Sequence, residues 1–207
     1  MNVQEATTRR LPDLKERHLP ENCRETINTI LKETYGYEQF RNLEIYDDLS
    51  KGKEKLCISQ GQLIENVILE AEKAWKSETQ VDNILLTAPT GSGKSLLFQL
   101  PAIYLGKEYN LLTIVVSPLK ALIVDQVESL QELGYARVAY ASSDLSPEQK
   151  MEVYRQVREG EIDLFYLSPE LLLSYDIKHF VGERRIGLVV VDEAHTVTTV
   201  SYTHLTL

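Results

Sequence analysis

The run at residues 88–95, Ala-Pro-Thr-Gly-Ser-Gly-Lys-Ser, constrains the fold of this chain more than any other stretch. It follows the apolar segment 83–87 and precedes an apolar helix. Gly91 and Gly93 let the backbone turn so that successive N–H groups point inward, and the start of the helix, expected near Lys94, adds its positive end. Thr-Gly-Ser-Gly also occurs in ordinary turns. The flanking strand and helix nevertheless favour a phosphate-binding loop.

Within this loop, each position has an expected role. The backbone of Ala88, Pro89, Thr90, Gly91, Ser92 and Gly93 would surround the phosphates of a nucleotide. Lys94 would reach the β and γ phosphates, and the hydroxyl of Ser95 would bind Mg²⁺. Ala88 is the one departure, because a glycine is usual at this first position.

A second run, Asp192-Glu193-Ala194-His195, follows the apolar residues 188–191. This order predicts that Asp192 lies at the carboxyl end of a buried parallel strand, at the edge where open α/β sheets bind ligands. There Asp192 would hold Mg²⁺ through water, and Glu193 would act on the attacking water. His195 belongs to the same candidate catalytic set. Taken alone, the run could also be a solvated helix start.

The second part of the chain alternates strand-like and helix-like segments. The expected strands are 83–87, 112–117, 136–141, 162–167 and 187–192. Such alternation predicts an α/β fold with a parallel sheet flanked by helices. Ser146, Pro147 and Gln149 predict a capped helix start, and Gly134 predicts the end of the preceding helix.

The first part of the chain is expected to be mostly helical. One helix would run from about Pro20 to Gly36, with Ile27, Ile30, Leu31 and Thr34 on one face, and a second would carry Ile64, Val67, Ile68, Ala71 and Trp75. Both stripes are typical of core packing. Residues 42–59 are predicted to be an inserted loop or short hairpin.

Composition narrows the class of protein. Of the 207 residues, 43% are hydrophobic, and no stretch is long enough to span a bilayer. Cys23 and Cys57 lack the spacing of a zinc site or a disulfide scaffold. The net charge of −9 argues against binding nucleic acid by bulk electrostatics, although a narrow groove of amides and hydroxyls stays possible.

A series of motifs together resembles the first motor domain of RecQ-like superfamily 2 DNA helicases. They occur at residues 35–41 (Tyr-Gly-Tyr-Glu-Gln-Phe-Arg), at the phosphate loop, at 115–119 with Asp125-Gln126-Val127, at 167–170, and at the Asp-Glu-Ala-His run. The resemblance covers about residues 21–195. It implies a RecA-like domain that uses ATP and Mg²⁺ and acts on single-stranded or partly duplex DNA.

The resemblance also implies an adenine site. Tyr37 and Arg41 match the family's adenine-packing aromatic residue and arginine. The family glutamine that reads the edge of the base does not follow directly, because residues 42–44 are Asn-Leu-Glu. Gln62, which begins the second helix after the extra segment, is the expected reader of adenine. A flat ring needs a stacking partner, and its donor and acceptor edge suits a carboxamide. Alternatively, Tyr37 and Arg41 merely pack the helix.

Two further loops are implied to bind the DNA backbone. They contain Ser117, Pro118, Leu119 and Lys120, and Ser168, Pro169 and Glu170. Each lies where a strand ends and a helix begins, so helix capping is the simpler interpretation, and both roles are compatible. Backbone contacts predict sequence-tolerant binding that weakens with salt.

The sequence predicts four regions. Residues 1–20 are expected to be disordered or loosely packed, 21–82 to recognise adenine, 83–200 to form the ATP-binding domain, and 201–207 to be a non-native tail. The second motor domain, which supplies an arginine finger in the family, is expected to be missing from this chain.

The expected function is that of an ATP-dependent DNA helicase with 3′ to 5′ polarity, present here as its N-terminal motor domain. Its location would be the bacterial cytoplasm or the eukaryotic nucleus. The alternatives are a duplex DNA or RNA translocase that does not separate strands, and a non-catalytic ATP-binding regulatory module.

Overall fold

The computed structural model describes residues 19–46, 55–76, 83–86 and 91–193. Its helices are α1 (Glu25–Tyr35), α2 (Gln60–Trp75), α3 (Leu96–Tyr109), α4 (Lys120–Glu132), α5 (Pro147–Arg158), α6 (Pro169–Ser174) and α7 (Ile177–Val181). Its strands are β1 (Asn42–Tyr46), β2 (Lys55–Ser59), β3 (Leu112–Val116), β4 (Val138–Ala141), β5 (Leu164–Leu167) and β6 (Ile186–Val191).

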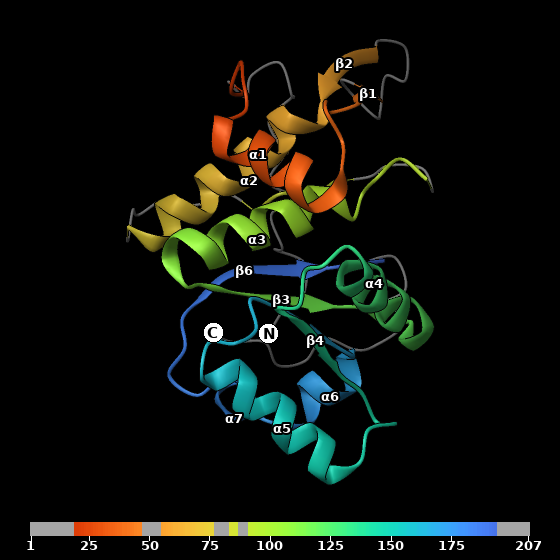
Figure 1. Cartoon of the computed structure of the whole chain (residues 1–207), viewed down its shortest axis with the longest axis vertical. Coiled ribbons are helices and arrows are strands. Elements are labelled where there is room, and N and C mark those ends of the chain that lie inside the picture. The colour runs from red at the N-terminus through yellow and green to blue at the C-terminus, as the bar shows by residue number, and fades with distance from the viewer. Residues whose placement is uncertain (1–18, 47–54, 77–82, 87–90, 194–207) are drawn as a thin grey trace, which may run out of the picture.

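Four parallel strands form the central sheet, in the order β4-β5-β3-β6. Helices cover both faces, with α1, α2 and α3 stacked above the sheet and α5, α6 and α7 below it in Figure 1. The side chains of β3 explain this layering, because Leu112, Ile114 and Val116 enter one hydrophobic core while Val115 enters the other. The predicted α/β fold with a parallel sheet flanked by helices is confirmed.

The four later strands match the expected segments to within two residues at each end. The first expected strand, 83–87, differs. Residues 83–86 adopt no regular structure, Leu85 is 67% exposed, and Thr87 lies outside the described residues. An apolar run can become a strand only where its backbone finds a pairing partner. In the structure this segment pairs with no strand among the described residues.

Strand β6 is consequently an edge strand of the described sheet. Val189 is 56% and Val191 45% exposed, so the prediction that Asp192 follows a buried strand was wrong about burial. Its position at the carboxyl end of a parallel strand is as expected: the N–H of Asp192 donates to the carbonyl of Val116 at the end of β3 (2.9 Å).

We call α1, α2 and the antiparallel β1–β2 hairpin the upper layer. Ile27, Ile30 and Leu31 of α1 are buried as predicted, and Gly36 ends this helix with a φ of 69°. In α2, the buried set includes Ile64, Ile68 and Ala71. The antiparallel pairing of β1 with β2 agrees with the hairpin alternative for residues 42–59, of which residues 47–54 lie outside the described residues.

A cluster of ion pairs and hydrogen bonds connects α2 with Arg24 and with α3. Arg24 contacts Glu65 (2.6 Å) and Glu72 (2.7 Å), both on α2. The hydroxyls of Tyr104 on α3 and Tyr109 also donate to Glu72, at 3.3 and 2.9 Å. Burial raises the pKa of Glu72, but the hydrogen bonds from Arg24 and the two tyrosines more than offset it, so the pKa lies below its usual value.

A second cluster lies at the start of β5, around Asp163, which is fully buried. Its carboxylate accepts hydrogen bonds from Tyr135 (3.0 Å), Arg137 (2.6 and 2.9 Å) and Arg184 (3.0 Å). Gly106 of α3 faces this carboxylate so closely that a Cβ at Gly106 would lie 2.3 Å from the Asp163 Cγ. Close packing of α3 on the sheet therefore requires glycine here.

The start of α5 and the end of α4 agree with the sequence predictions. Ser146 forms a capping box with Gln149 at the start of α5, and Pro147 occupies the first turn. Gly134, with a φ of 85°, follows the end of α4. Helix α3 begins at Leu96, two residues later than expected, after a turn at Lys94 and Ser95.

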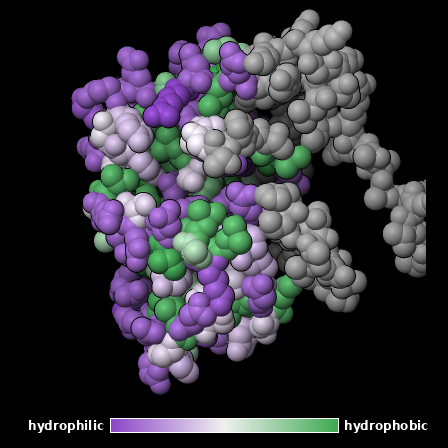
Figure 2. Space-filling view, turned by 90° about the vertical axis from the view of Figure 1, so that its right-hand side faces the viewer, coloured by the Kyte–Doolittle hydropathy of each residue, from purple (hydrophilic) through white to green (hydrophobic). Residues whose placement is uncertain are grey.

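Several predictions fall outside the described residues: the N-terminal 18 residues, the boundary at 77–82, and the tail from 201 onward. Within the described ranges, no helix is both long and apolar enough to cross a membrane. The face in Figure 2 mixes hydrophilic and hydrophobic side chains, with hydrophilic ones along much of its rim.

Candidate nucleotide site

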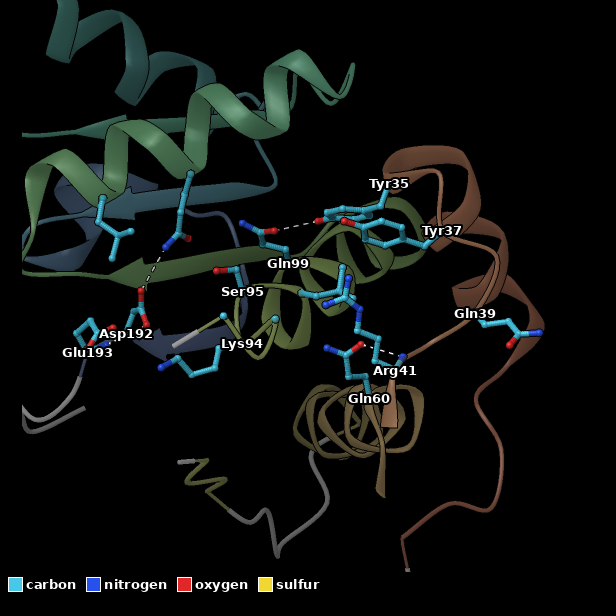
Figure 3. Close-up of a pocket in the computed structure, with 15 residues that line it drawn as sticks. Tyr35, Tyr37, Gln39, Arg41, Gln60, Lys94, Ser95, Gln99, Asp192 and Glu193 are labelled. Atoms are coloured by element: carbon cyan, nitrogen blue, oxygen red, sulfur yellow. Dashed lines mark hydrogen bonds between the residues drawn. The ribbon is translucent and has the colours of Figure 1, made fainter. Parts of the chain in front are cut away.

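A pocket of about 510 Å³ opens where the upper layer meets the carboxyl edge of the sheet. Figure 3 shows residues from α1, α2, α3, α4 and the end of β6 converging on it. The lining residues are Tyr35, Tyr37, Gln39, Arg41, Gln60, Gly91, Gly93, Lys94, Ser95, Leu96, Gln99, Leu122, Gln126, Asp192 and Glu193. Its size suits a nucleotide.

The described half of the phosphate loop has the backbone that the sequence predicts. Gly91 and Gly93 have φ angles of 79° and 78°, which side chains other than glycine rarely adopt. Lys94 and Ser95 follow and line the pocket. Ala88, Pro89 and Thr90 lie outside the described residues, and Ser92 does not line the pocket.

Gln60, the first residue of α2, supports this loop. Its amide donates to the carbonyl of Ser92 (3.2 Å), and its side-chain oxygen accepts from the N–H of Arg41 (3.2 Å). A Cβ at Gly93 would lie 2.6 Å from the Gln60 amide nitrogen. Gly93 therefore combines a positive φ, which favours glycine, with a close approach to the end of the Gln60 side chain.

Asp192 and Glu193 line the end of the pocket that lies beside the carboxyl end of β6 (Figure 3). The Asp192 carboxylate accepts from the N–H of Glu193 (3.0 Å) and from the amide of Gln126 (3.4 Å). Glu193 has a φ of 51°, in the left-handed region that few residues other than glycine adopt. This turn places both carboxylates in one pocket. His195 lies outside the described residues.

At the other end, Tyr35 and Tyr37 form an aromatic wall. Their rings stack with centroids 6.3 Å apart and planes 19° apart. Tyr37 is 50% exposed, so its ring face is accessible, and Arg41 lines the same region. The structure thus brings Tyr37 and Arg41 together as expected, and adds Tyr35, which the sequence analysis did not single out.

The structure separates Gln62 from the pocket. Its side chain completes the capping box of α2 by accepting from the N–H of Ser59 (3.0 Å), and donates to the carbonyl of Pro20 (3.1 Å). Gln60 lines the pocket instead. Two residues along a helix turn a side chain by about 200°, so both glutamines cannot face one site. Because β1 and β2 separate Arg41 from α2, the sequence alone does not show which of the two glutamines faces the pocket.

A chain of hydrogen bonds connects the two ends of the pocket. Tyr35 donates to Gln99 (3.0 Å), Gln99 to Tyr166 (3.2 Å), Tyr166 to Gln126 (3.0 Å), and Gln126 to Asp192 (3.4 Å). Sequence analysis did not identify Gln99 or Tyr166. Tyr35, Gln126 and Asp192 each lie in a sequence motif, but Gln99 and Tyr166 do not, because these side chains meet through packing of distant segments.

Burial further favours the protonated form of the two tyrosines in this series of hydrogen bonds, Tyr35 and Tyr166. It raises the pKa of the Tyr166 hydroxyl above its usual value, and it does the same for Tyr35, assisted by the nearby Tyr166 and Tyr37. Both hydroxyls therefore stay available as donors at neutral pH.

The oxygen donors present fit a magnesium ion. The hydroxyl of Ser95 and the carboxylate of Asp192 line the same pocket. Among the described residues, no group of three or more His, Cys, Asp or Glu side chains is placed to hold a metal. Mg²⁺ commonly uses one or two protein oxygens together with water and substrate phosphates. Ser95 and Asp192 are therefore a suitable pair for an ion that arrives with a nucleotide.

The two loops expected to bind DNA follow adjacent strands. Val116 pairs with Leu167, and the N–H of Ser117 donates to the Leu167 carbonyl (3.1 Å), so Ser117 and Ser168 lie at the same sheet edge. Ser168 caps α6 through the N–H of Leu171 (3.4 Å) with Pro169 in the first turn, whereas the Ser117 hydroxyl is buried without a hydrogen-bond partner among the described residues.

The remaining residues of these loops lie at the surface. Leu119 is 52% exposed, Pro118 is half-buried, and Glu170 is exposed. Lys120 contacts Asp144 (2.8 Å) and Ser143 in the loop after β4. Capping thus explains Ser168 and not Ser117.

Comparison with known proteins identifies the family to which this architecture belongs. The family model described as DEAD/DEAH box helicase matches residues 69–205. The "ATP-dependent DNA helicase Q-like 5" of Arabidopsis thaliana is 33% identical over 175 residues, and the "ATP-dependent DNA helicase RecQ" of Synechocystis sp. is 33% identical over 174. These alignments cover 84% and 83% of this chain but only 16% and 30% of the relatives.

Solved structures agree on the fold. A crystal structure of the DUF1998 helicase MrfA bound to DNA and AMPPNP has a TM-score of 0.51 at 22% sequence identity, covering 87% of this chain and 22% of that one. The RecA-like arrangement of sheet and flanking helices is thereby supported independently. With a family model matching well over half its length, this chain belongs to the DEAD/DEAH box helicase family, as a helicase domain homologous to RecQ-type ATP-dependent DNA helicases.

Proposed function

We propose that this domain binds ATP with Mg²⁺ and single-stranded DNA, and serves as the first motor domain of a RecQ-like helicase that moves 3′ to 5′. The observation that carries the proposal is the single pocket in which Lys94, Ser95, Asp192 and Glu193 meet the aromatic wall of Tyr35 and Tyr37. Phosphate, metal and base chemistry thus share one pocket, as a nucleoside triphosphate requires.

Each end of the nucleotide has proposed partners. Tyr37 stacks on adenine, Arg41 packs beside it, and the Gln60 amide, already lining the pocket, replaces Gln62 as the carboxamide near the base. The loop that contains Gly91 and Gly93 would surround the phosphates, as the sequence of residues 88–93 predicts, and Lys94 would contact the β and γ phosphates.

Ser95 would hold Mg²⁺ directly, and Asp192 would hold it through water. When bound, the ion neutralises charge on the phosphate oxygens. Glu193 lines the pocket beside Asp192 and would orient the attacking water and accept its proton. His195, which lies outside the described residues, is proposed to belong to this catalytic group because it ends the Asp-Glu-Ala-His run.

The sheet edge beyond β3 and β5 would bind the DNA backbone. The free N–H groups at the start of α4 and the side chain of Lys120 supply donors for phosphates. Because such contacts carry no base code, binding should tolerate any sequence and weaken with salt.

Nucleotide binding by this chain tests the proposal. Isothermal titration with ATP and Mg²⁺ should show one site, and Lys94→Ala should weaken binding at least about tenfold, as expected for loss of a charge-assisted contact of about 1.5–3 kcal/mol. Lys107→Ala, on the C-terminal turn of α3, is the matched control and should bind like the wild type. Equal binding by both variants would contradict the phosphate role of Lys94.

DNA binding and turnover test the remainder. Single-stranded oligonucleotides of unrelated sequence should bind with similar affinity, and Lys120→Ala should weaken all of them alike. Hydrolysis by this chain should be slow, since an arginine finger from a second motor domain contributes about 10³–10⁵ in rate. ATP binding without any DNA effect would favour a regulatory module, and a preference for duplex would favour a translocase.

A further inference from the structure

The hydrogen-bond chain from Tyr35 to Asp192 crosses five separate segments of the fold. Tyr35 ends α1, Gln99 lies in α3, Tyr166 in β5, Gln126 in α4, and Asp192 follows β6. Tyr166 at its centre is fully buried, whereas Gln99 and Gln126 are nearly buried and also line the pocket. At Tyr166, a water molecule therefore cannot easily replace a missing hydroxyl.

Every link of the chain runs in the same direction. Each hydroxyl or amide donates toward Asp192 and accepts from the Tyr35 side. The carboxylate can only accept when ionised, so it requires the Gln126 NH₂ to face it, which turns the Gln126 oxygen toward Tyr166. Tyr166 then accepts from the Gln99 NH₂, and the Gln99 oxygen accepts from Tyr35. One anion thereby sets the orientation of all the donors.

We propose that Gln126, Tyr166 and Gln99 are positioning residues that hold the Asp192 carboxylate for the metal and make its placement depend on Tyr35 at the base end of the pocket. The proposal rests on the nucleotide site proposed above and adds its internal coupling. Gln126 supplies the one side-chain hydrogen bond to Asp192 within the described residues, and the backbone N–H of Glu193 supplies the other contact.

Direct evidence for positioning comes from the geometry at Asp192. Gln126 contacts Oδ2 at 3.4 Å and Glu193 contacts Oδ1 at 3.0 Å, so each carboxylate oxygen has one donor within the described residues. Without Gln126, only one oxygen would be held. The carboxylate could then rotate, and the oxygen facing a metal-bound water would lose its fixed position.

Tyr166→Phe breaks the chain at its buried centre without altering any residue that lines the pocket. We expect the affinity for ATP in EDTA to stay within about twofold of the wild type. The affinity for ATP with Mg²⁺ should fall about two- to tenfold, the equivalent of one neutral hydrogen bond, because Gln126 keeps its bond to Asp192 but loses the hydroxyl that orients it. Tyr154→Phe is the matched control, because Tyr154 is equally buried (3% exposed) but lies in the other core. It should match the wild type in both titrations.

Two further variants test the coupling. Gln126→Met keeps the length of the side chain but removes the donor to Asp192, and should weaken metal-dependent binding at least as much as Tyr166→Phe. The double variant should be no weaker than Gln126→Met alone, since both changes break the same chain. Tyr35→Phe retains the aromatic ring, yet should reduce the metal-dependent gain about twofold from the far end of the pocket.

The outcomes separate this proposal from the proposed function. If the wild type does not bind ATP, the proposed function fails. If it binds ATP with Mg²⁺ and Tyr166→Phe, still folded by circular dichroism, shows the same metal-dependent gain, the positioning chain is refuted. Equal losses with and without Mg²⁺, or additive losses in the double variant, would also overturn it, because they indicate general loosening of the pocket.

Discussion

Asp163 lies at the amino end of one strand of the central sheet and Asp192 at the carboxyl end of another, and the surroundings of the two carboxylates differ. Asp163 precedes β5, is fully buried, and accepts hydrogen bonds from Tyr135, Arg137 twice and Arg184, which fills the roughly four acceptor positions of a carboxylate. Asp192 follows β6, lines the pocket, and accepts from Glu193 and Gln126. A carboxylate whose acceptor positions are all filled thus has a structural role, whereas a carboxylate with spare acceptor positions at a pocket is available to a ligand.

The largest expected effect is at the saturated carboxylate. Asp163→Asn should lower the free energy of unfolding by about 3–5 kcal/mol, because it leaves Arg184, almost fully buried, without its charge partner. Burial already lowers the pKa of Arg184, which shows the cost of keeping this charge inside. Urea denaturation at pH 7 measures the change.

Asp144→Asn provides the control for that experiment. Asp144 contacts Lys120 at 2.8 Å, but both groups are exposed, so the urea midpoint should not change measurably. If Asp163→Asn were as stable as this control, saturation by arginines would not identify a structural carboxylate.

The next effect concerns the Arg24 cluster. Arg24→Met should lower stability at pH 7 by about 2–3 kcal/mol, less than Asp163→Asn because the Arg24 side chain is 25% exposed. The folded-state pKa of Glu72 lies below its ordinary value of 4.5, so the stability it contributes is present above pH 4.5 and is lost as the pH falls through the lowered pKa. Stability curves from pH 7 down to pH 3 should thus fall less steeply in Arg24→Met than in the wild type. Equal slopes in the two proteins would show that Arg24 does not lower the pKa of Glu72.

A smaller loss is expected at Gly106. Gly106→Ala would bring a Cβ to within 2.3 Å of the Asp163 Cγ, which the surrounding arginines hold in place. Overpacking of this kind costs about 1–3 kcal/mol. Gly134→Ala has open space around its Cβ, so its cost should reflect only the positive φ. A greater loss at Gly134 than at Gly106 would show that the Asp163 cluster can move, contrary to its saturated geometry.

The sequence predicted the parts of the site that local patterns encode. The turns at Gly91 and Gly93, the position of Asp192 after a strand, and the helix caps at Ser146 and Ser168 depend on neighbouring residues. The fold class followed from the alternation of strand-like and helix-like segments, because each apolar face needs a partner layer.

Contacts between distant segments were beyond such patterns. Gln99 and Tyr166 are 67 positions apart, and either could equally pack a core as an ordinary helix or strand residue. Gln60 and Gln62 are both plausible from composition, and only the direction of α2 decides which faces the pocket. The expected strand at 83–87 failed because strand formation depends on a pairing partner as well as on apolar side chains.

Asp192 keeps acceptor capacity for a nucleotide-bound magnesium ion. Asp192→Asn measures it most directly, since the amide retains the shape but loses the negative charge. Isothermal titration of ATP, with Mg²⁺ and with EDTA, should show that the variant retains wild-type affinity without metal and loses most of the metal-dependent gain, while its urea midpoint stays near that of the wild type. An unchanged metal-dependent gain in a folded Asp192→Asn protein would contradict the account.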